Sequence, residues 1–403
     1  MRRAGTHIAL MMILAGSFFL LGAAQKAPCA SEGYARTFSG PKFPCYSDLS
    51  VLYHFEQLAE DRIPYLDPCS PQERPCDEYP VLTMYTMWGA ATTGGKVAGF
   101  PGFYWTNVAV MLACALATVW ALERLGARTT LFAAAPALAL YGALNWDLAA
   151  VAATTIATLL LLRRRDVAAG VALGIGAAAK LYPALVALPF ALHRDHQHRR
   201  RQGVTLAVAA AATWGLINLP FAIGGTSGWN EVFRFNRARG ADYESVWTAI
   251  CQFGFCLSAR GLNVLVPLFV ASVTWWIWRR TTRRVPDVPR WIMALPLLIV
   301  VVVTGKFWSP QYALWLLPWF ALSRIPVRVW LAYQLSEVLE FMARTAFMTA
   351  VPGTGTVSLR LLSVTVALRA VLLLRCLWVW MGDPEPASGV LSDATPSVVT
   401  GGH

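Results

Sequence analysis

Long apolar stretches separated by short polar segments run along most of this chain. The clearest ones hold few or no charged residues, and they lie at 103–122, 147–162, 203–222, 260–278 and 356–381. Stretches of about 20 apolar residues match a hydrocarbon core that is roughly 30 Å thick. Because a helix satisfies its own backbone hydrogen bonds in lipid, the pattern predicts an all-α, polytopic membrane protein.

Shorter apolar stretches add further predicted spans. A first span is expected at about 6–24, and the others at 130–144, 290–304, 311–323 and 328–348, which gives ten to twelve crossings. The start of the chain, with Arg2 and Arg3 before the apolar stretch, is also typical of a cleavable signal peptide. We favour an uncleaved first span in a protein with this many predicted spans.

Arginines gather in short loops between the predicted spans, at 163–165, 199–201 and 279–284. Such an excess marks the cytoplasmic loops of membrane proteins. If the N-terminus lies inside, all three loops lie inside only when the segment 81–93 does not cross the membrane. We therefore predict that 81–93 lies on, or dips into, the outer surface.

The stretch 167–193 is apolar but has basic residues on both flanks. Both flanks should then be cytoplasmic, yet about 27 residues are too few to cross the membrane twice at full length. The sequence predicts a tight hairpin or a re-entrant pair with Lys180-Leu181-Tyr182-Pro183 at its tip. Gly170, Gly174 and Gly176 suit such a closely packed element.

Composition supports the membrane assignment. The 403 residues are 56% hydrophobic and only 14% charged, whereas a soluble domain has about a quarter charged residues. The net charge of +12 would suggest nucleic acid in a soluble protein, but here the basic residues lie in loops between spans, so no nucleic-acid partner is expected. We detect no internal repeat, which counts against the repeat-built transporter folds.

These observations define one transmembrane domain over 1–381. Its long outer loops are expected at 25–102, with amphipathic or re-entrant helices, and at 223–259. The polar segment 382–403, rich in Pro, Ser and Thr, is predicted to be a disordered cytoplasmic tail. Nearly all of the polar motifs therefore fall on the outer side, where any chemistry is expected.

Six of the eight cysteines fall in predicted outer loops, namely Cys29, Cys45, Cys69, Cys76, Cys251 and Cys256. An even number of cysteines in an oxidising compartment is typical of disulfides. The short spacings make Cys69–Cys76 and Cys251–Cys256 plausible pairs, although sequence alone does not fix the connectivity. A zinc site is the alternative, but no histidine stands at ligand spacing, and we expect neither a metal nor a cofactor.

Two acidic motifs in the first outer loop are candidates for chemistry. Asp48 precedes apolar residues at the spacing of an amphipathic helix, and its simplest role is to cap that helix. Asp77 and Glu78 precede Pro80, which is typical of a polar loop that leads into a helix. Either motif could instead supply a reactive carboxylate.

Three further motifs combine polar and aromatic residues on the predicted outer side. Asn145 and Asp147 flank Trp146 and could bind a polyol or form a capped turn. Arg237 and Arg239 lie in an aromatic stretch over 229–247, which suits a phosphate or a solvated interfacial helix. The segment from Lys306 to Tyr312, including Gln311, has Pro310 at a helix start, where an anion is favoured.

Within the predicted spans, Glu337, Glu340, Arg344 and Arg369 are ionisable, and Glu340 and Arg344 could pair along one helix.

Two stretches resemble glycosyltransferase family 87, a group of membrane glycosyltransferases in the GT-C superfamily. They read NWDLAAVAATTIATLLLLRRRDVAAGVALGIGAAAKLYPALVALPFAL and KFWSPQYALWLLP, and their most specific elements are Lys-Leu-Tyr-Pro and Ser-Pro-Gln-Tyr. The resemblance covers the chain from Asp48 to about residue 323, and the loop 25–102 is divergent. It implies a GT-C-type fold in the bacterial plasma membrane.

The resemblance also implies a reaction. Members of the family move a sugar, typically mannose, from a polyprenyl-phosphate donor to a lipid-linked or glycan acceptor on the outer face, with inversion. It makes Asp48 the expected catalytic base, with Asp77 and Glu78 in reserve. The expected phosphate ligands are Lys180, Arg237, Arg239 and Lys306, and the expected sugar or acceptor contacts are Asn145, Asp147, Tyr182, Gln311 and Tyr312. The alternative is a transporter or flippase for a lipid-linked sugar, which the gathering of polar motifs on one side does not explain.

Overall fold

The computed structural model describes residues 2–31, 45–70, 75–349 and 355–391. These residues form helices and connecting loops, and no strand occurs among them beyond an isolated bridge between Ser323 and Pro386. The α-helices are α1 (Arg2–Lys26), α3 (Asp48–Phe55), α4 (Val81–Ala90), α5 (Lys96–Leu125), α6 (Thr130–Ala133), α7 (Pro136–Tyr141), α8 (Asp147–Leu162), α9 (Asp166–Ala179), α10 (Tyr182–His196), α11 (Arg200–Gly224), α12 (Thr226–Ala238), α13 (Val246–Cys251), α14 (Ala259–Arg284), α15 (Ala294–Thr304), α16 (Ala313–Leu322), α17 (Val327–Met348) and α18 (Gly355–Gly382). The all-α prediction is confirmed.

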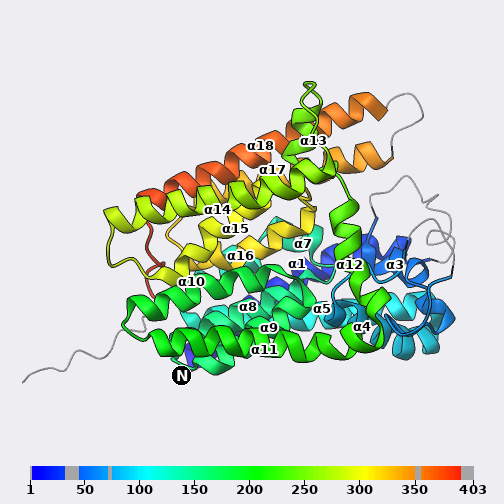
Figure 1. Ribbon diagram of the computed structural model, residues 1–403, viewed down its shortest axis with the longest axis horizontal. Helices are drawn as coiled ribbons and strands as arrows, with labels where there is room; N and C mark the ends of the chain where they lie inside the picture. The colour runs from blue at the N-terminus through cyan, green and yellow to red at the C-terminus, as the bar shows by residue number, and fades with distance from the viewer. Residues whose placement is uncertain (1, 32–44, 71–74, 350–354, 392–403) are drawn as a thin grey trace, which may run out of the picture.

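The long helices run side by side, and the short helices α3, α4, α12 and α13 gather at one end of the bundle (Figure 1). Five helical stretches among the described residues are long and apolar enough to cross a membrane: Gly5–Cys29, Val81–Leu125, Arg200–Gly224, Ala259–Arg284 and Ser358–Gly382. The predicted total of ten to twelve crossings stays a prediction, because several of the other helices are shorter.

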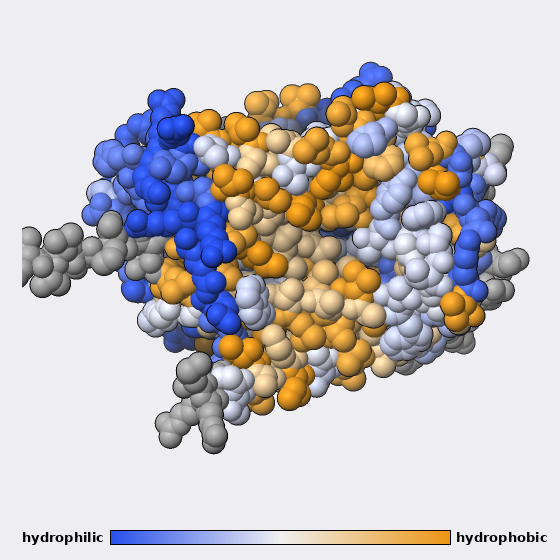
Figure 2. Space-filling view, turned by 90° about the horizontal axis from the view of Figure 1, so that it is seen from below, coloured by the Kyte–Doolittle hydropathy of each residue, from blue (hydrophilic) through white to orange (hydrophobic). Residues whose placement is uncertain are grey.

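The molecular surface has the polarity expected of a membrane protein. Figure 2 shows a broad hydrophobic band between two more hydrophilic ends. Apolar side chains in this band point outward, for example Leu216 on α11, which is 73% exposed, and Val264 on α14, which is 63% exposed. Lipid chains cover such surfaces in a bilayer, so the outward apolar residues need no further partner.

The segment predicted not to cross the membrane forms α4 and a π-helical turn, Ala91–Gly95. By length and composition, Val81–Leu125 is one apolar stretch of 45 helical residues. However, the backbone leaves the helix at Ala98 (φ −136°) and Gly99 (φ +60°), which separates α4 from the long part of α5. The helical run before this break, from Val81 to Val97, is about 25 Å long, which is somewhat shorter than a hydrocarbon core of roughly 30 Å. The placement of 81–93 on the outer surface stays a prediction.

The predicted hairpin over 167–193 is present. Helix α9 ends at Ala179 and α10 begins at Tyr182, and the two helices pack against each other. Lys180 and Leu181 form the tip. A side chain at Gly170 would lie 2.3 Å from the Leu206 carbonyl oxygen, so this glycine lets α9 approach α11 closely. The hairpin tip reaches α4, where the Thr83 hydroxyl donates to the Ala179 carbonyl over 2.7 Å.

The arginine-rich loops meet at the opposite end of the bundle, which we call the basic end. There, Arg194 pairs with Asp166 over 2.6 Å, and Arg128 donates to the carbonyls of Phe320, Ser323 and Ile325. The chain after α18 returns to this end. Leu391 donates its amide to the Leu125 carbonyl, and Ala387 donates to Leu322. The predicted disorder of the tail is therefore wrong for 383–391, and 392–403 lies outside the described residues.

The four ionisable residues that the sequence singled out inside α17 and α18 form ion pairs. The Arg369 guanidinium lies 3.4 Å from Glu337 and 3.7 Å from Glu340, and all three side chains are fully buried. Arg344 pairs with Glu244 of the loop before α13, over 2.6 Å, and not along its own helix with Glu340 as the sequence suggested. The reason is that the loop folds over the end of α17 and brings a second carboxylate to it.

Three disulfides join Cys29 to Cys45, Cys69 to Cys76, and Cys251 to Cys256. They tie down loops at the end of the bundle that carries α3 and α13. Cys114 and Cys376 remain free. The two pairs that the short spacings suggested are thus present, and the remaining two loop cysteines pair with each other.

Candidate active site

The first turn of α3 leaves the Asp48 side chain available. Its neighbour Ser47 is the residue that caps the helix, because the Ser47 hydroxyl accepts a hydrogen bond from the Leu49 amide. The same hydroxyl donates to the Ala143 carbonyl over 2.7 Å, and the Asp48 amide donates to Leu144 over 2.9 Å. The start of α3 is therefore fixed to the segment before α8, and the capping role considered for Asp48 falls to Ser47.

Three side chains hold the Asp48 carboxylate. Tyr46 donates to one oxygen over 2.7 Å, and the Asn145 amide donates to the other over 2.6 Å. The Tyr79 hydroxyl lies 3.3 Å from that second oxygen and also accepts from Asn145. Burial, and then the nearby Asp48 charge, raise the pKa of Tyr79, so this phenol keeps its proton and remains a donor. These contacts fix the direction of the carboxylate.

The carboxylate faces a cavity of about 550 Å³, which we call the Asp48 cavity. Its walls come from parts of the chain that are distant in sequence, among them the α3 region, the segment before α4, the loop between α12 and α13, the loop before α16, and the end of α17. They include Tyr46, Tyr79, Arg239, Asp242, Glu244, Ser309, Gln311 and Arg344. Most of these side chains are polar, which suits a ligand with several hydroxyl groups.

A second cavity of about 610 Å³, the Lys180 cavity, shares a wall with the first. Tyr79, Phe235, Arg239, Ser309 and Gln311 border both. The other walls combine cations, aromatic rings and aliphatic side chains, among them Glu78, Lys180, Leu181, Tyr182, Leu185, Lys306, Tyr312 and Trp315. Leu181 and Leu185 are 50% and 41% exposed, so this cavity opens toward the apolar surface of the bundle.

Arg239 stands where the two cavities meet. Its guanidinium lies over the rings of Phe235 and Phe307, at 5.0 and 4.6 Å from their centres, and 3.2 Å from the Asp242 carboxylate. Aromatic faces attract a guanidinium and hold its plane in place. Its side chain is 41% exposed, so this arginine remains accessible to an anion.

Lys306 fixes the backbone beside Arg239. Its ammonium donates to the carbonyls of Asn236 and Arg239 and to the Asn263 side chain. An ammonium has three protons, so all of its donors are engaged, two at the end of α12 and one at Asn263 of α14. Burial, and then the charge of Arg239, lower the pKa of Lys306. The arrangement favours a positioning role for Lys306 over the direct phosphate contact expected from the sequence.

Lys180 lines the Lys180 cavity, and an ion pair holds its ammonium in place. Its ammonium lies 3.4 Å from the fully buried Asp147 carboxylate and 4.7 Å from the centre of the Tyr79 ring. Trp315 donates to the other Asp147 oxygen over 2.7 Å. The ring of Trp315 in turn stacks between Tyr182 and Tyr312, at 4.3 and 3.9 Å. Asp147 thus holds the Lys180 ammonium in place by an ion pair and lines neither cavity.

The remaining predicted residues differ in their placement. Gln311, Tyr312 and Tyr182 line a cavity as expected, whereas Asn145 binds the Asp48 carboxylate and lines neither cavity. Arg237 is exposed and borders neither cavity.

The two reserve carboxylates differ from each other. Asp77 is held by Arg62 over 2.6 Å and by the Tyr65 amide over 3.1 Å, away from both cavities. Burial raises the pKa of Asp77, and Arg62 opposes that rise. Glu78 lines the Lys180 cavity. Of the three carboxylates proposed as a base, Asp48 alone lines the more polar cavity.

Sequence reasoning missed two wall residues, Arg344 and Glu244. Arg344 lies in an apolar helix and was interpreted as part of an intrahelical pair, and Glu244 stood among many polar residues of its loop. In the structure, the Arg344 guanidinium lies 5.3 Å from the centre of the Tyr46 ring, next to the tyrosine that binds Asp48. The position of Arg344 near the end of its helix was the available signal, because charges there can reach the surface.

The site thus offers one oriented carboxylate beside a polar cavity and a cluster of cations beside a partly apolar one. A carboxylate in reach of a hydroxyl can remove its proton during attack. Cations at the junction can stabilise a phosphate that leaves from the other side. The pair of cavities is suited to group transfer from a phosphate-linked amphiphile to a polyol.

One comparison with known proteins identifies a family for this chain. The model of glycosyltransferase family 87 matches residues 79–304. No curated protein matches. The crystal structure of ArnT from Cupriavidus metallidurans bound to undecaprenyl phosphate is similar over 92% of this chain and 76% of that chain, with 13% sequence identity and a TM-score of 0.39, a likeness too distant to carry an argument.

Proposed function

The chain belongs to glycosyltransferase family 87, and we propose that this membrane glycosyltransferase moves a sugar, most simply mannose, from a polyprenyl-phosphate donor to a hydroxyl-bearing acceptor. The transfer takes place on the extracytoplasmic face and inverts the anomeric carbon. The observation that carries the proposal is the oriented Asp48 carboxylate, which faces one cavity while cations line the next.

In the proposed reaction the acceptor occupies the Asp48 cavity. Its hydroxyl attacks the anomeric carbon, and Asp48 takes the proton as the new glycosidic bond forms. The bond between the anomeric carbon and the phosphate oxygen breaks at the same time, and the electron pair leaves with the polyprenyl phosphate. Attack on the side opposite to the leaving group accounts for inversion.

The Lys180 cavity suits the donor. Arg239 and Lys180 line it and supply positive charge where the leaving phosphate would develop its negative charge. The exposed Leu181 and Leu185 at its border suit the start of an isoprenoid chain that continues into the surrounding lipid. Tyr182, Tyr312 and Gln311 would contact the sugar between the phosphate and the acceptor.

The charges of the Asp48 cavity favour a neutral acceptor. Asp48, Asp242 and Glu244 line it together with two arginines, and each arginine already pairs with one of these acids. An additional anionic group close to the reacting hydroxyl would meet uncompensated negative charge. We therefore propose a glycan hydroxyl, free or lipid-linked, whose nearest phosphate lies outside this cavity.

The proposed orientation of the protein in the membrane follows from the position of the basic end. Because short arginine-rich loops remain in the cytoplasm, the opposite end, with Asp48 and both cavities, would face outward. The three disulfides at that end fit an oxidising compartment. The tail after α18 would then be cytoplasmic.

The experiment uses membranes that contain the full chain and polyprenyl-phosphate mannose with a radiolabelled sugar. We expect label on a new, more polar product with the wild type. With Asp48→Asn we expect equal expression and a loss of about 10²–10⁴-fold in transfer. Wild-type turnover in Asp48→Asn would refute the base assignment. Label that crosses the bilayer while still on the donor would instead indicate a lipid-linked sugar transporter.

A further inference from the structure

The last turns of α14 carry tryptophans and arginines in two parallel rows. Trp275, Arg279 and Arg283 follow one another at intervals of four residues, and Trp276, Arg280 and Arg284 do the same one position later. Since residues four apart share a helix face, each row presents a tryptophan followed by two arginines. All six side chains line one open cavity of about 770 Å³ at the basic end.

The rows are ordered along the axis of α14. Each tryptophan lies about 6 Å nearer the middle of α14 than the first arginine of its row. The Arg279 guanidinium lies 5.5 Å from the centre of the Trp275 ring, and Arg280 lies 5.7 Å from Trp276. The two rings are 60% and 53% exposed. Amphipathic rings at this level belong to the zone between hydrocarbon and head groups.

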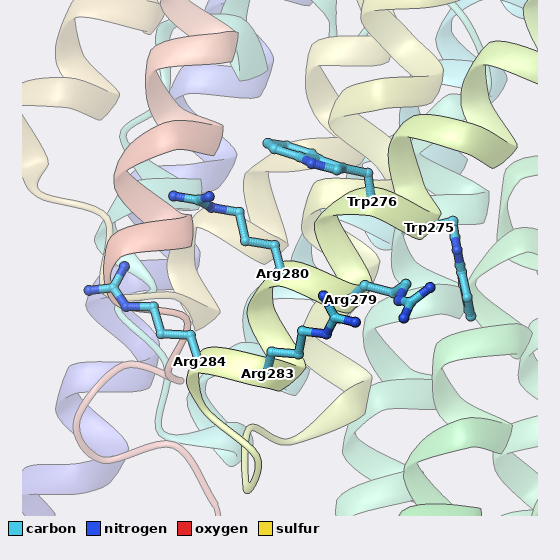
Figure 3. A pocket seen from close by; sticks show the side chains of 6 residues that line it. All are labelled: Trp275, Trp276, Arg279, Arg280, Arg283 and Arg284. Atoms are coloured by element: carbon cyan, nitrogen blue, oxygen red, sulfur yellow. The ribbon is translucent and has the colours of Figure 1, made fainter.

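The arginines point to both sides of the helix. Figure 3 shows Arg280 and Arg284 directed toward α18, and Arg279 beside Trp275 on the other side. Arg284 donates to the Met381 carbonyl at the end of α18. Within the described part of the chain, none of the four arginines forms an ion pair with a carboxylate, and the nearby Asp287 acts on Arg290. Among the residues that the structure describes, the cavity therefore concentrates positive charge without a carboxylate counter-ion.

We propose that this cavity binds the anionic head group of a phospholipid in the leaflet at the basic end. The arginines would hold the phosphate oxygens by bidentate hydrogen bonds, and Trp275 and Trp276 would pack on the glycerol and the first methylenes of the acyl chains. The chemistry is a phosphate ester joined to an apolar tail, and each part of the cavity matches one part of it. The inference stands apart from the glycosyl transfer, because both reaction cavities lie at the other end of the bundle.

The test counts bound lipids on the purified full chain by native mass spectrometry, after reconstitution into nanodiscs of phosphatidylcholine with a minor share of phosphatidylglycerol. The test variant is Arg279→Gln/Arg280→Gln/Arg283→Gln, which keeps Arg284 and its contact with α18. The matched control is Arg163→Gln/Arg164→Gln/Arg165→Gln, which removes the same charge from exposed arginines at the same end without tryptophans beside them.

We expect the wild type and the control to retain phosphatidylglycerol, and the test variant to bind it at least about tenfold more weakly. A second variant, Trp275→Leu/Trp276→Leu, should also weaken retention while it leaves the charge unchanged. Equal loss in the test variant and the control would overturn the proposal in favour of a diffuse charge effect. Complete displacement of the lipid by excess inorganic phosphate would show a free-anion site and would likewise overturn it.

Discussion

Asn145 donates a hydrogen bond of 2.6 Å from its amide nitrogen to the Asp48 carboxylate, although 97 residues separate the two in the sequence. The bond joins the start of α3 to the turn before α8, and it holds one oxygen of the carboxylate in place. Asn145 also donates to Tyr79, so one amide orients two of the groups around the proposed base.

Replacement of Asn145 by alanine should therefore lower kcat without a comparable change in the KM for the donor. A hydrogen bond to a charged group contributes about 1.5–3 kcal/mol, so we expect a loss of roughly 10–100-fold in kcat. Steady-state kinetics in detergent micelles would measure it. Gln57→Ala is the control, because it removes an amide that binds only the Ser70 backbone in the same loop region. An equal loss in Gln57→Ala would contradict the positioning role.

Lys306 offers a second kinetic test. If it positions the end of α12, Lys306→Met should raise the KM for donor and acceptor together, because Arg239 borders both cavities. We expect an effect of about tenfold on each, from the loss of charge-assisted hydrogen bonds. A change confined to the donor KM would instead show that Lys306 binds the donor phosphate directly, as the sequence first suggested.

Lys180 and Asp147 form an ion pair, and loss of one partner should destabilise the fold more than loss of both. Lys180→Met leaves the fully buried Asp147 without its cation, and such a change costs about 3–5 kcal/mol in other proteins. The double variant Lys180→Met/Asp147→Asn should recover much of that loss while transfer remains impaired. Thermal unfolding in detergent would compare the three proteins. A double variant less stable than Lys180→Met would contradict this account.

Glu56 should make the stability of the outer loop region depend on pH. Burial raises the pKa of Glu56 from 4.5 to about 8, while the hydrogen bond from the Asp77 amide lowers it in part. As the pH rises, Glu56 of the unfolded chain loses its proton first. The contribution of Glu56 to the free energy of unfolding is therefore complete below about pH 4.5 and is lost as the pH rises through about 8. The loss in the free energy of unfolding amounts to about 5 kcal/mol at most.

Glu56→Gln should flatten the fall in thermal stability between about pH 5 and 8, the range between the two pKa values. Glu60→Gln serves as the control, because Glu60 is exposed in the adjacent turn. The same slope in wild type and Glu56→Gln would show that another group carries the pH dependence.

Thiol labelling of the unreduced, denatured protein should detect Cys114 and Cys376 alone. After reduction, all eight cysteines should react. The disulfide of Cys29 and Cys45 closes the longest of the three loops, so its removal should destabilise the fold most, by about 3 kcal/mol. Six additional reactive thiols before reduction would contradict the three disulfides.

The predictable parts of this molecule were those that the membrane dictates. Arginine parity made 167–193 a hairpin, because that interpretation depends only on length, polarity and the cost of burying charge. The placement of 81–93 outside the spans stays a prediction, since Val81–Leu125 is long and apolar enough to cross a membrane. The same reasoning placed Asp48, Lys180, Arg237 and Lys306 on one side. In the structure Asp48, Lys180 and Lys306 line the two cavities, whereas Arg237 borders neither. Sequence reasoning assigned Asp48 the cap of α3 as its simplest role, whereas Ser47 is the cap, since both residue types suit that position.

The errors came from contacts between distant segments. Lys306 resembled a phosphate ligand in sequence, but α12 presents its terminal carbonyls to that ammonium. Arg344 had an acid four residues earlier in its own helix, yet the loop before α13 supplied Glu244. Residues 383–391 have the composition of a disordered tail, but they pack on Leu125 and Leu322 through backbone hydrogen bonds that composition does not reveal.

Arg239 gives the two cavities a common wall, and this has a consequence for the order of events in turnover. A single guanidinium cannot adopt one rotamer for the donor and another for the acceptor at the same moment. A substrate in either cavity therefore limits the conformations that Arg239 can adopt toward the other cavity. The apparent affinity for one substrate should then vary with the concentration of the other. In double-reciprocal plots of rate against one substrate, the lines for different concentrations of the other substrate should intersect above or below the horizontal axis. Lines that meet on that axis would show that the two substrates bind independently.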